Sequence, residues 1–180
     1  MNTYISLLRG INVSGQKKIK MAALKSIYES LKFDNVITYI QSGNVVFKSL
    51  DEKVIIKTSI EVAIKEHFDF DVPVLILTHN QLENTSKNLP FSDVDIEQEG
   101  SKIIIFFLSE TISHNQEETF GGYLTNSEQL VMGQDVIYLY CPDGLGKSKL
   151  TNKLIETKLK LTSAARNIKT VNKLLSLANS

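Results

Sequence analysis

The sequence predicts an α+β protein made of two βαββαβ units in tandem, of which the second is incomplete and ends in a helix. Three observations support this prediction. Short apolar, β-branched runs alternate with segments whose apolar residues recur every three or four positions, turn residues separate them, and this order occurs twice. The 180 residues, 42% of them hydrophobic, are sufficient for two small cores.

The first unit follows from its elements in chain order. Four segments have the composition of strands, namely residues 3–8, 36–40, 45–48 and 72–77. Two segments carry the apolar stripe of an amphipathic helix, namely residues 21–33 and 51–68. Asp51 and Glu52 stand where carboxylates cap a helix, and the turn Ser42, Gly43, Asn44 joins two strands into a hairpin. The resulting order βαββαβ is that of the split ferredoxin-like unit.

The second unit repeats this order in outline. Its expected strands are residues 102–108, 129–132 and 136–140, and its expected helices are part of 112–124, 148–161 and 168–178. The last helix stands where a fourth strand would be expected, so the sequence predicts that this unit is incomplete. We therefore expect one ferredoxin-like unit over residues 1–92 and a second, with its C-terminal helix, over residues 100–180.

Composition excludes several classes of protein. The formal net charge is zero, so a general nucleic-acid binder of the basic kind is not expected. Cys141 is the only cysteine, which rules out an internal disulfide and suits a reducing cytoplasm. No basic region precedes the short apolar run at the start, and no run approaches the roughly 20 apolar residues that span a bilayer, so we expect neither secretion nor a membrane.

Polar side chains follow the first strand and fill the hairpin turn. Right-handed crossovers place the first and third strands side by side, so residues 9–20 and 41–44 are expected to leave the sheet at one end. Arg9, Asn12, Gln41 and Asn44 would supply donors there, and Lys149 and Arg166 of the second unit would close the site. Such a site could hold a phosphate or carboxylate. Equally, Gly10, Gly15, Gly43 and Asn44 could serve the turns, with the lysines in water.

Four motifs resemble, in the same order, a bacterial family called domain of unknown function 1697. They are SLLRGINVSGQKKIKM, TYIQSGNVVF, GLGKSKLTNKL and ARNIKTVNKLL, and together they cover nearly the whole chain. The resemblance implies a tandem ferredoxin-like fold and no established activity. Members typically have Thr-Thr-Arg-Asn-Trp near the C-terminus, where this chain has Ala164, Ala165, Arg166, Asn167 and Ile168. Arg166 and Asn167 are therefore kept as ligand candidates, without the two hydroxyls and the aromatic ring.

Three sharper interpretations do not fit the residues, and a fourth stays open. Gly146, Lys147 and Ser148 imitate the end of a P-loop, but Cys141 stands where its first glycine is required. Gln98 stands at the sixth position of the acidic run 93–100, where a calcium loop needs glycine. The histidines, His67, His79 and His114, lack metal-ligand spacing, so no metal is expected. A Cys141 nucleophile stays open beside the simpler view that this thiol is a packing residue.

We therefore expect a protein that binds a small anion carrying a phosphate or carboxylate group, and we expect no cofactor. Catalysis and oligomeric state stay undecided, because no pair of residues forms a convincing general acid and base. One alternative is single-stranded RNA binding, with Tyr4 and Phe47 stacking on bases from the central strands. Another is a structural, self-associating module.

Overall fold

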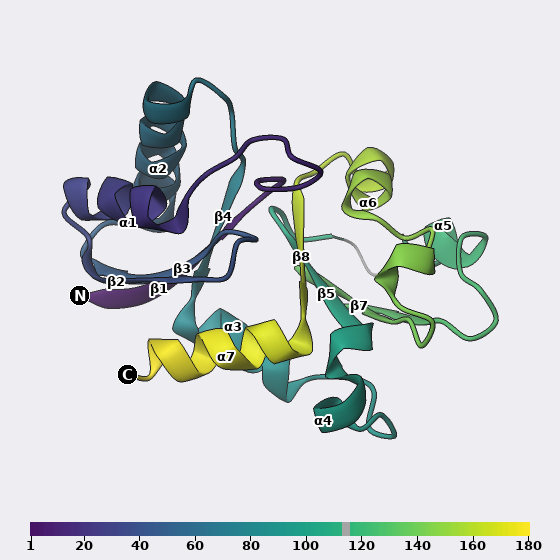
Figure 1. Cartoon of the computed structure of the whole chain (residues 1–180). Coiled ribbons are helices and arrows are strands. Elements are labelled where there is room, and N and C mark those ends of the chain that lie inside the picture. The colour runs from purple at the N-terminus through teal and green to yellow at the C-terminus, as the bar shows by residue number, and fades with distance from the viewer. Residues whose placement is uncertain (113–115) are drawn as a thin grey trace. The chain divides into compact units, whose positions relative to one another are not determined.

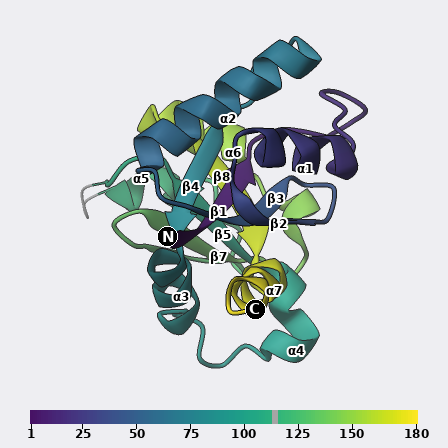
Figure 2. The same ribbon diagram turned by 90° about the vertical axis from the view of Figure 1, so that its left-hand side faces the viewer.

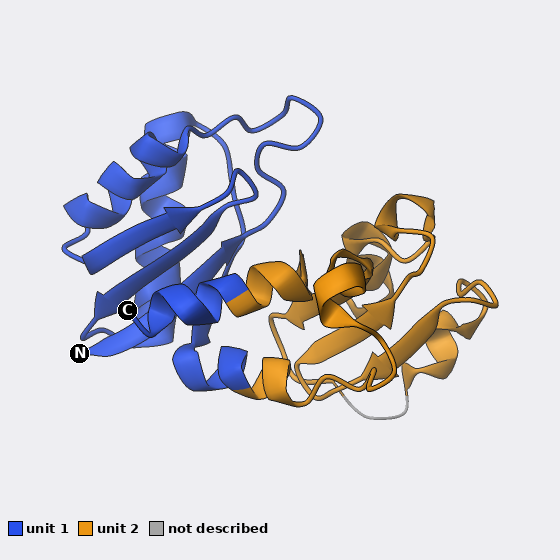
Figure 3. Ribbon diagram, turned by 60° about the horizontal axis from the view of Figure 1, so that its bottom comes forward, with its two compact units in different colours: residues 1–83, 173–180 blue, residues 84–172 orange. Residues whose placement is uncertain are grey.

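The computed structural model describes residues 1–112 and 116–180, which form two compact units. Figure 3 colours unit 1, residues 1–83 and 173–180, and unit 2, residues 84–172. The chain passes from unit 1 to unit 2 within α3 (His79–Lys87) and returns within α7 (Ile168–Ala178). No helix in the described ranges is both long and apolar enough to cross a bilayer.

Unit 1 contains a four-stranded antiparallel sheet in the order β2-β3-β1-β4. Its strands are β1 (Asn2–Leu8), β2 (Asp34–Tyr39), β3 (Asn44–Ser49) and β4 (Val74–Thr78). The helices α1 (Met21–Ser30) and α2 (Lys53–Phe68) lie on one face of this sheet (Figures 1 and 2). The predicted βαββαβ order is confirmed.

The core of unit 1 lies between this sheet face and the two helices. Side chains alternate between the two faces of a strand, so Tyr4 and Leu8 of β1 and Phe47 of β3 face the apolar stripes of α1 and α2. The Tyr28 hydroxyl lies 2.7 Å from Ser6 Oγ in the interior, and burial raises the pKa of Tyr28 above its usual value. This packing fixes the strands whose ends carry the polar loops.

Unit 2 contains a second four-stranded antiparallel sheet, in the order β6-β7-β5-β8. Its strands are β5 (Ile103–Leu108), β6 (Gln129–Met132), β7 (Val136–Tyr140) and β8 (Ser163–Asn167). It also contains the helices α4 (Ile96–Glu99), α5 (Glu118–Gly121) and α6 (Asn152–Leu159), together with the short 3₁₀ turns 100–102 and 145–147. The α+β class with two ferredoxin-like units is thus confirmed.

The expectation that unit 2 is incomplete was wrong, because β8 completes its sheet. The segment Ser-Ala-Ala-Arg-Asn lacks the β-branched and aromatic residues typical of strands. It pairs with the most apolar strand of the chain, with Ala164 opposite Phe107 and Ala165 opposite Phe106. Small residues therefore lie opposite bulky ones, and this pairing outweighs the weak intrinsic preference of the segment.

Other differences concern helices. The helix expected within residues 112–124 is reduced to α5, and residues 113–115 of that prediction lie outside the described ranges. The helix α3 was missed because its segment, HNQLENTSK, is polar throughout except for Leu82. Glu52 occupies the N-cap of α2 without a side-chain bond to the helix, while Asp51 accepts a hydrogen bond from Ser49 Oγ at 3.3 Å.

Candidate functional site

Two loops meet at one end of the unit 1 sheet. We call them the loop pair, which comprises residues 9–20 between β1 and α1 and residues 40–43 between β2 and β3. Leu8 N donates to Gly43 O at 2.8 Å, and Asn12 Nδ2 donates to Gln41 O at 2.8 Å. The shared location of these loops, which the sequence predicts from strand order, is confirmed.

Asn12 and Asn44 direct their side-chain amides at the chain itself. Asn12 Nδ2 also donates to Ile19 O at 3.0 Å, and its Oδ1 accepts from Ile19 N at 2.9 Å. Asn44 is fully buried and donates from Nδ2 to Tyr39 O and to Ser42 Oγ, both at 3.0 Å. These two side chains hold the loops in shape, as turn-stabilising residues do.

The charged side chains of the loop pair are all basic. Arg9 is half-buried, and its backbone N donates to Pro73 O at 2.9 Å. Lys17 Nζ donates to Asp71 O at 2.5 Å, while Lys18, Lys20 and Gln41 are exposed. Residues 9–20 contain four basic and no acidic side chains. A local positive field follows from this imbalance.

The other three candidates, Lys149, Arg166 and Asn167, belong to unit 2. Arg166 is 9% exposed, and its Nη1 donates to Ala165 O at 2.8 Å. Asn167 Oδ1 accepts from Thr170 N at 2.9 Å and so caps the first turn of α7. Lys149 is exposed and precedes α6. Their participation in one site with Arg9 stays a prediction.

The P-loop-like segment forms a short turn before α6. Residues 145–147 are a single 3₁₀ turn, and Ser148 Oγ accepts from Leu150 N at 3.1 Å. The helix begins at Asn152, with Thr151 Oγ1 as its N-cap acceptor for Leu154 N at 3.2 Å. The expectation that a helix starts at Ser148 was therefore wrong by about one turn, because Ser148 Oγ accepts within the turn before the helix and Thr151 is the N-cap.

Cys141 lies in the core of unit 2. It is 1% exposed, its Sγ donates to Lys102 O at 3.2 Å, and burial raises the pKa of its thiol to about 11. We expect alkylation of the folded protein by iodoacetamide at pH 8 to be at least about 100-fold slower than that of a cysteine peptide, because little thiolate forms. Mass spectrometry measures this rate, and peptide-like reactivity would contradict the buried position. The urea-unfolded chain is the control and should react at the peptide rate.

Metal ligands do not gather in the part of the chain that the structure describes. No group of three His, Cys, Asp or Glu side chains there could hold an ion. His67 contacts the Phe68 ring, and His79 Nε2 lies 2.8 Å from Asn179 Oδ1. His114 lies outside the described residues.

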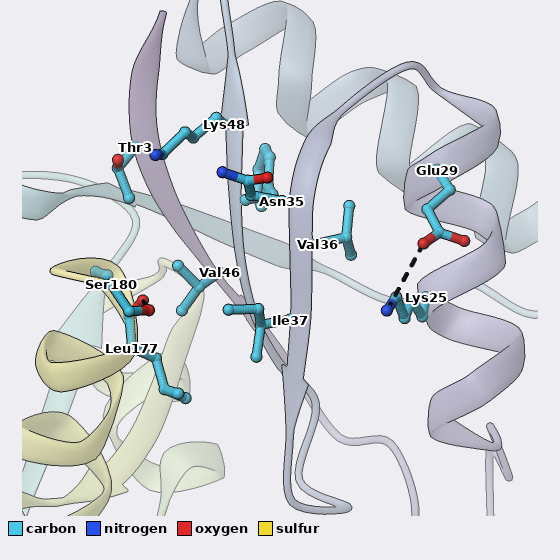
Figure 4. A pocket seen from close by; sticks show the side chains of 12 residues that line it. Thr3, Lys25, Glu29, Asn35, Val36, Ile37, Val46, Lys48, Leu177 and Ser180 are labelled. Atoms are coloured by element: carbon cyan, nitrogen blue, oxygen red, sulfur yellow. Dashed lines mark hydrogen bonds and ion pairs between the residues drawn. The ribbon is translucent and has the colours of Figure 1, made fainter.

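A cavity of about 440 Å³ opens in unit 1 at the other end of β1 from Arg9. Its lining includes Thr3 of β1, Asn35 of β2, Lys48 of β3 and Leu177 of α7 (Figure 4). Thr3 and Leu8 are separated by roughly 17 Å of strand, so this cavity is distinct from the loop pair. Sequence reasoning missed it, and the one hint was the Asp34-Asn35 pair at the start of a strand, where turn-forming residues are unusual.

The aromatic residues of the RNA hypothesis are in the core. Tyr4 and Phe47 are 5% and 0% exposed, and their ring centroids lie 6.0 Å apart within the helix-covered cluster. A base-stacking platform requires aromatic faces that reach solvent. These two rings therefore stabilise unit 1 and do not form such a platform.

Two antiparallel four-stranded sheets with the same strand order define a tandem ferredoxin-like protein of the α+β class. The chain belongs to the family described as "Protein of unknown function (DUF1697)", whose model matches residues 1–138, so the predicted family is confirmed. Its structure is similar to that of the conserved bacterial protein SP0830 from Streptococcus pneumoniae, with 26% identity, 98% of each chain covered and a TM-score of 0.77. No curated protein matches the chain.

Proposed function

We propose that this protein binds a small anion carrying a phosphate or carboxylate group at the loop pair of unit 1. The observation that carries the proposal is the contact between the two loops, in which Asn12 bridges the β1–α1 loop to Gln41. That contact ties Gln41, which is exposed, to the loop that carries Arg9, Lys17, Lys18 and Lys20, and neither loop has an acidic side chain. Anion recognition needs such a fixed cluster of donors and positive charge.

The roles within this site differ from one residue to another. Asn12 and Asn44 fix the loops, since their amides are bonded to the chain. Arg9 leaves the strand next to Gly10, whose positive φ of 74° turns the backbone out of the sheet. In the proposed site, Arg9 and Lys18 contact the anion and Gln41 orients it. Lys149, Arg166 and Asn167 are additional candidates from unit 2.

A titration with inorganic pyrophosphate and citrate at low ionic strength tests this function. We expect calorimetry to show binding of one probe, and the double variant Lys18→Gln, Lys20→Gln to weaken it by at least about tenfold, because each charged contact is strong in a fixed site. When Arg9→Lys is added to that double variant, binding of the probe is expected to weaken further, since lysine lacks the bidentate fork of arginine.

The matched control is the double variant Lys32→Gln, Lys57→Gln. It removes the same charge from exposed lysines of the same unit outside the loop pair. Equal losses in the two double variants would assign the effect to net charge and contradict the proposal. Absence of binding by both probes at millimolar concentration would contradict it as well.

A further inference from the structure

The cavity of unit 1 has a polar end formed by two neighbouring strands. Thr3 of β1 and Lys48 of β3 are direct cross-strand partners, so both side chains lie on the same sheet face. Asp34 is the partner of Lys48 on β2, yet no carboxylate pairs with Lys48 within the described ranges. Lys48 is half-buried. Its ammonium therefore supplies positive charge at this end of the cavity.

A β-bulge brings Asn35 to the same end. Between Asp34, opposite Lys48, and Ile37, opposite Val46, β2 has two residues where β3 has one. Asn35 adopts the left-handed conformation with φ 50°, which bends the strand and re-aims its side chain. Figure 4 shows the Asn35 amide on the side of Lys48 and Thr3. The edge strand thus contributes an amide beside the ammonium and the hydroxyl.

The cavity also has an apolar wall. Ile37 and Val46 form its floor on the sheet, and Leu177 faces them from the last turn of α7 (Figure 4). His79, which follows β4, holds this end of α7 through its contact with Asn179 at 2.8 Å. A cavity of about 440 Å³ with an apolar wall and convergent polar groups at one end has the size of small-molecule sites.

Charge selects the kind of ligand. The cavity also borders on Lys25 and Glu29 of α1, whose side chains pair with each other at 3.7 Å. Lys48 is the other cation of the lining, and no carboxylate of the described residues lies within ion-pair distance of it. We propose that this cavity is a second binding site, which takes a monocarboxylate with an apolar chain, its carboxylate on Lys48, Thr3 and Asn35 and its chain along Ile37, Val46 and Leu177.

The test uses the full chain, labelled with ¹⁵N, and octanoate as the probe, with amide chemical shifts as the readout. We expect octanoate to perturb residues 35–37, 46–48 and 177–180. Acetate, which lacks the chain, and octylamine, which carries the opposite charge, should each bind at least about tenfold more weakly. Perturbations confined to other residues, or equal binding of octylamine and octanoate, would overturn the proposal.

Two variants test the polar end. Lys48→Gln should raise the dissociation constant of octanoate about tenfold, because it removes the charged contact. Asn35→Gly should raise it about threefold while keeping the backbone, since glycine accepts a positive φ. Lys57→Gln, an exposed lysine of α2, is the control and should leave it unchanged. An unchanged constant for Lys48→Gln would overturn the proposal.

This site and the loop pair can be told apart in one experiment. The variant Lys18→Gln, Lys20→Gln should leave octanoate binding unchanged, and Lys48→Gln should leave pyrophosphate and citrate binding unchanged. If neither pyrophosphate nor citrate binds at the loop pair, the proposed binding site in the cavity is therefore unaffected. If the Lys18 and Lys20 variant abolished the octanoate perturbations, the two sites would be one, and the second site would be rejected.

Discussion

Phe47→Ala is expected to lower the free energy of unfolding of unit 1 by about 3–5 kcal/mol. The Phe47 side chain is fully buried, and its ring centroid lies 4.7 Å from that of Phe33 and 5.3 Å from that of Tyr28. Removal of this ring leaves a cavity in the middle of an aromatic cluster whose members are held by β3, α1 and the turn after α1. A close-packed core relaxes only in part into such a vacated space, so the free energy of unfolding falls by more than the transfer free energy of the ring.

Urea unfolding followed by far-ultraviolet circular dichroism measures this loss, with amide hydrogen exchange of β1 and β3 to assign it to unit 1. Leu50→Ala is the control, because Leu50 is 76% exposed and should change the free energy of unfolding by less than about 0.5 kcal/mol. A loss below about 1 kcal/mol for Phe47→Ala would show that the ring is accessible. In that case the hypothesis of base stacking on this sheet would have to be reconsidered.

The sequence predicts those parts of the fold in which the pattern of apolar residues marks the buried face. In unit 1, alternating or continuous apolar residues revealed every strand, and the spacing of Leu24, Ile27 and Tyr28 revealed α1. The strand β8 was not predicted, because its small residues fit the bulky side chains of β5 beside them but do not show the apolar alternation typical of a strand. The polar helix α3 was not predicted for a related reason, since Leu82 is its one buried apolar residue.

The candidate site was predictable in position and less so in role. Strand order alone implied that residues 9–20 and 41–44 share one end of the sheet, because crossover handedness restricts the possible topologies. The amide of Asn12, however, bonds to carbonyls 7 and 29 residues away. No spacing rule shows whether such an amide meets a ligand or the chain. The cavity likewise depends on the bulge at Asn35, whose left-handed conformation is a property of the folded sheet.

Gly43→Ala is expected to lower the free energy of unfolding by about 2–4 kcal/mol, the second large effect. Gly43 has φ +77°, which costs a residue with a Cβ atom about 1 kcal/mol or more. A Cβ atom here would also lie 2.6 Å from Ile11 Cδ1 and 2.8 Å from Leu8 Cβ. Leu8 Cβ can move only with its strand, so overlap adds about 1–3 kcal/mol.

Gly10→Ala separates the two causes. Gly10 has nearly the same backbone conformation, φ +74°, but no atom within 4 Å of an added Cβ, so only the backbone cost applies. We expect urea unfolding to show a loss of about 1 kcal/mol for Gly10→Ala and a loss at least about 1 kcal/mol larger for Gly43→Ala. Equal losses would mean that the hairpin turn does not pack tightly against Leu8 and Ile11. That packing holds the two loops together. Equal losses would therefore also count against the rigid loop pair on which the proposed anion binding depends.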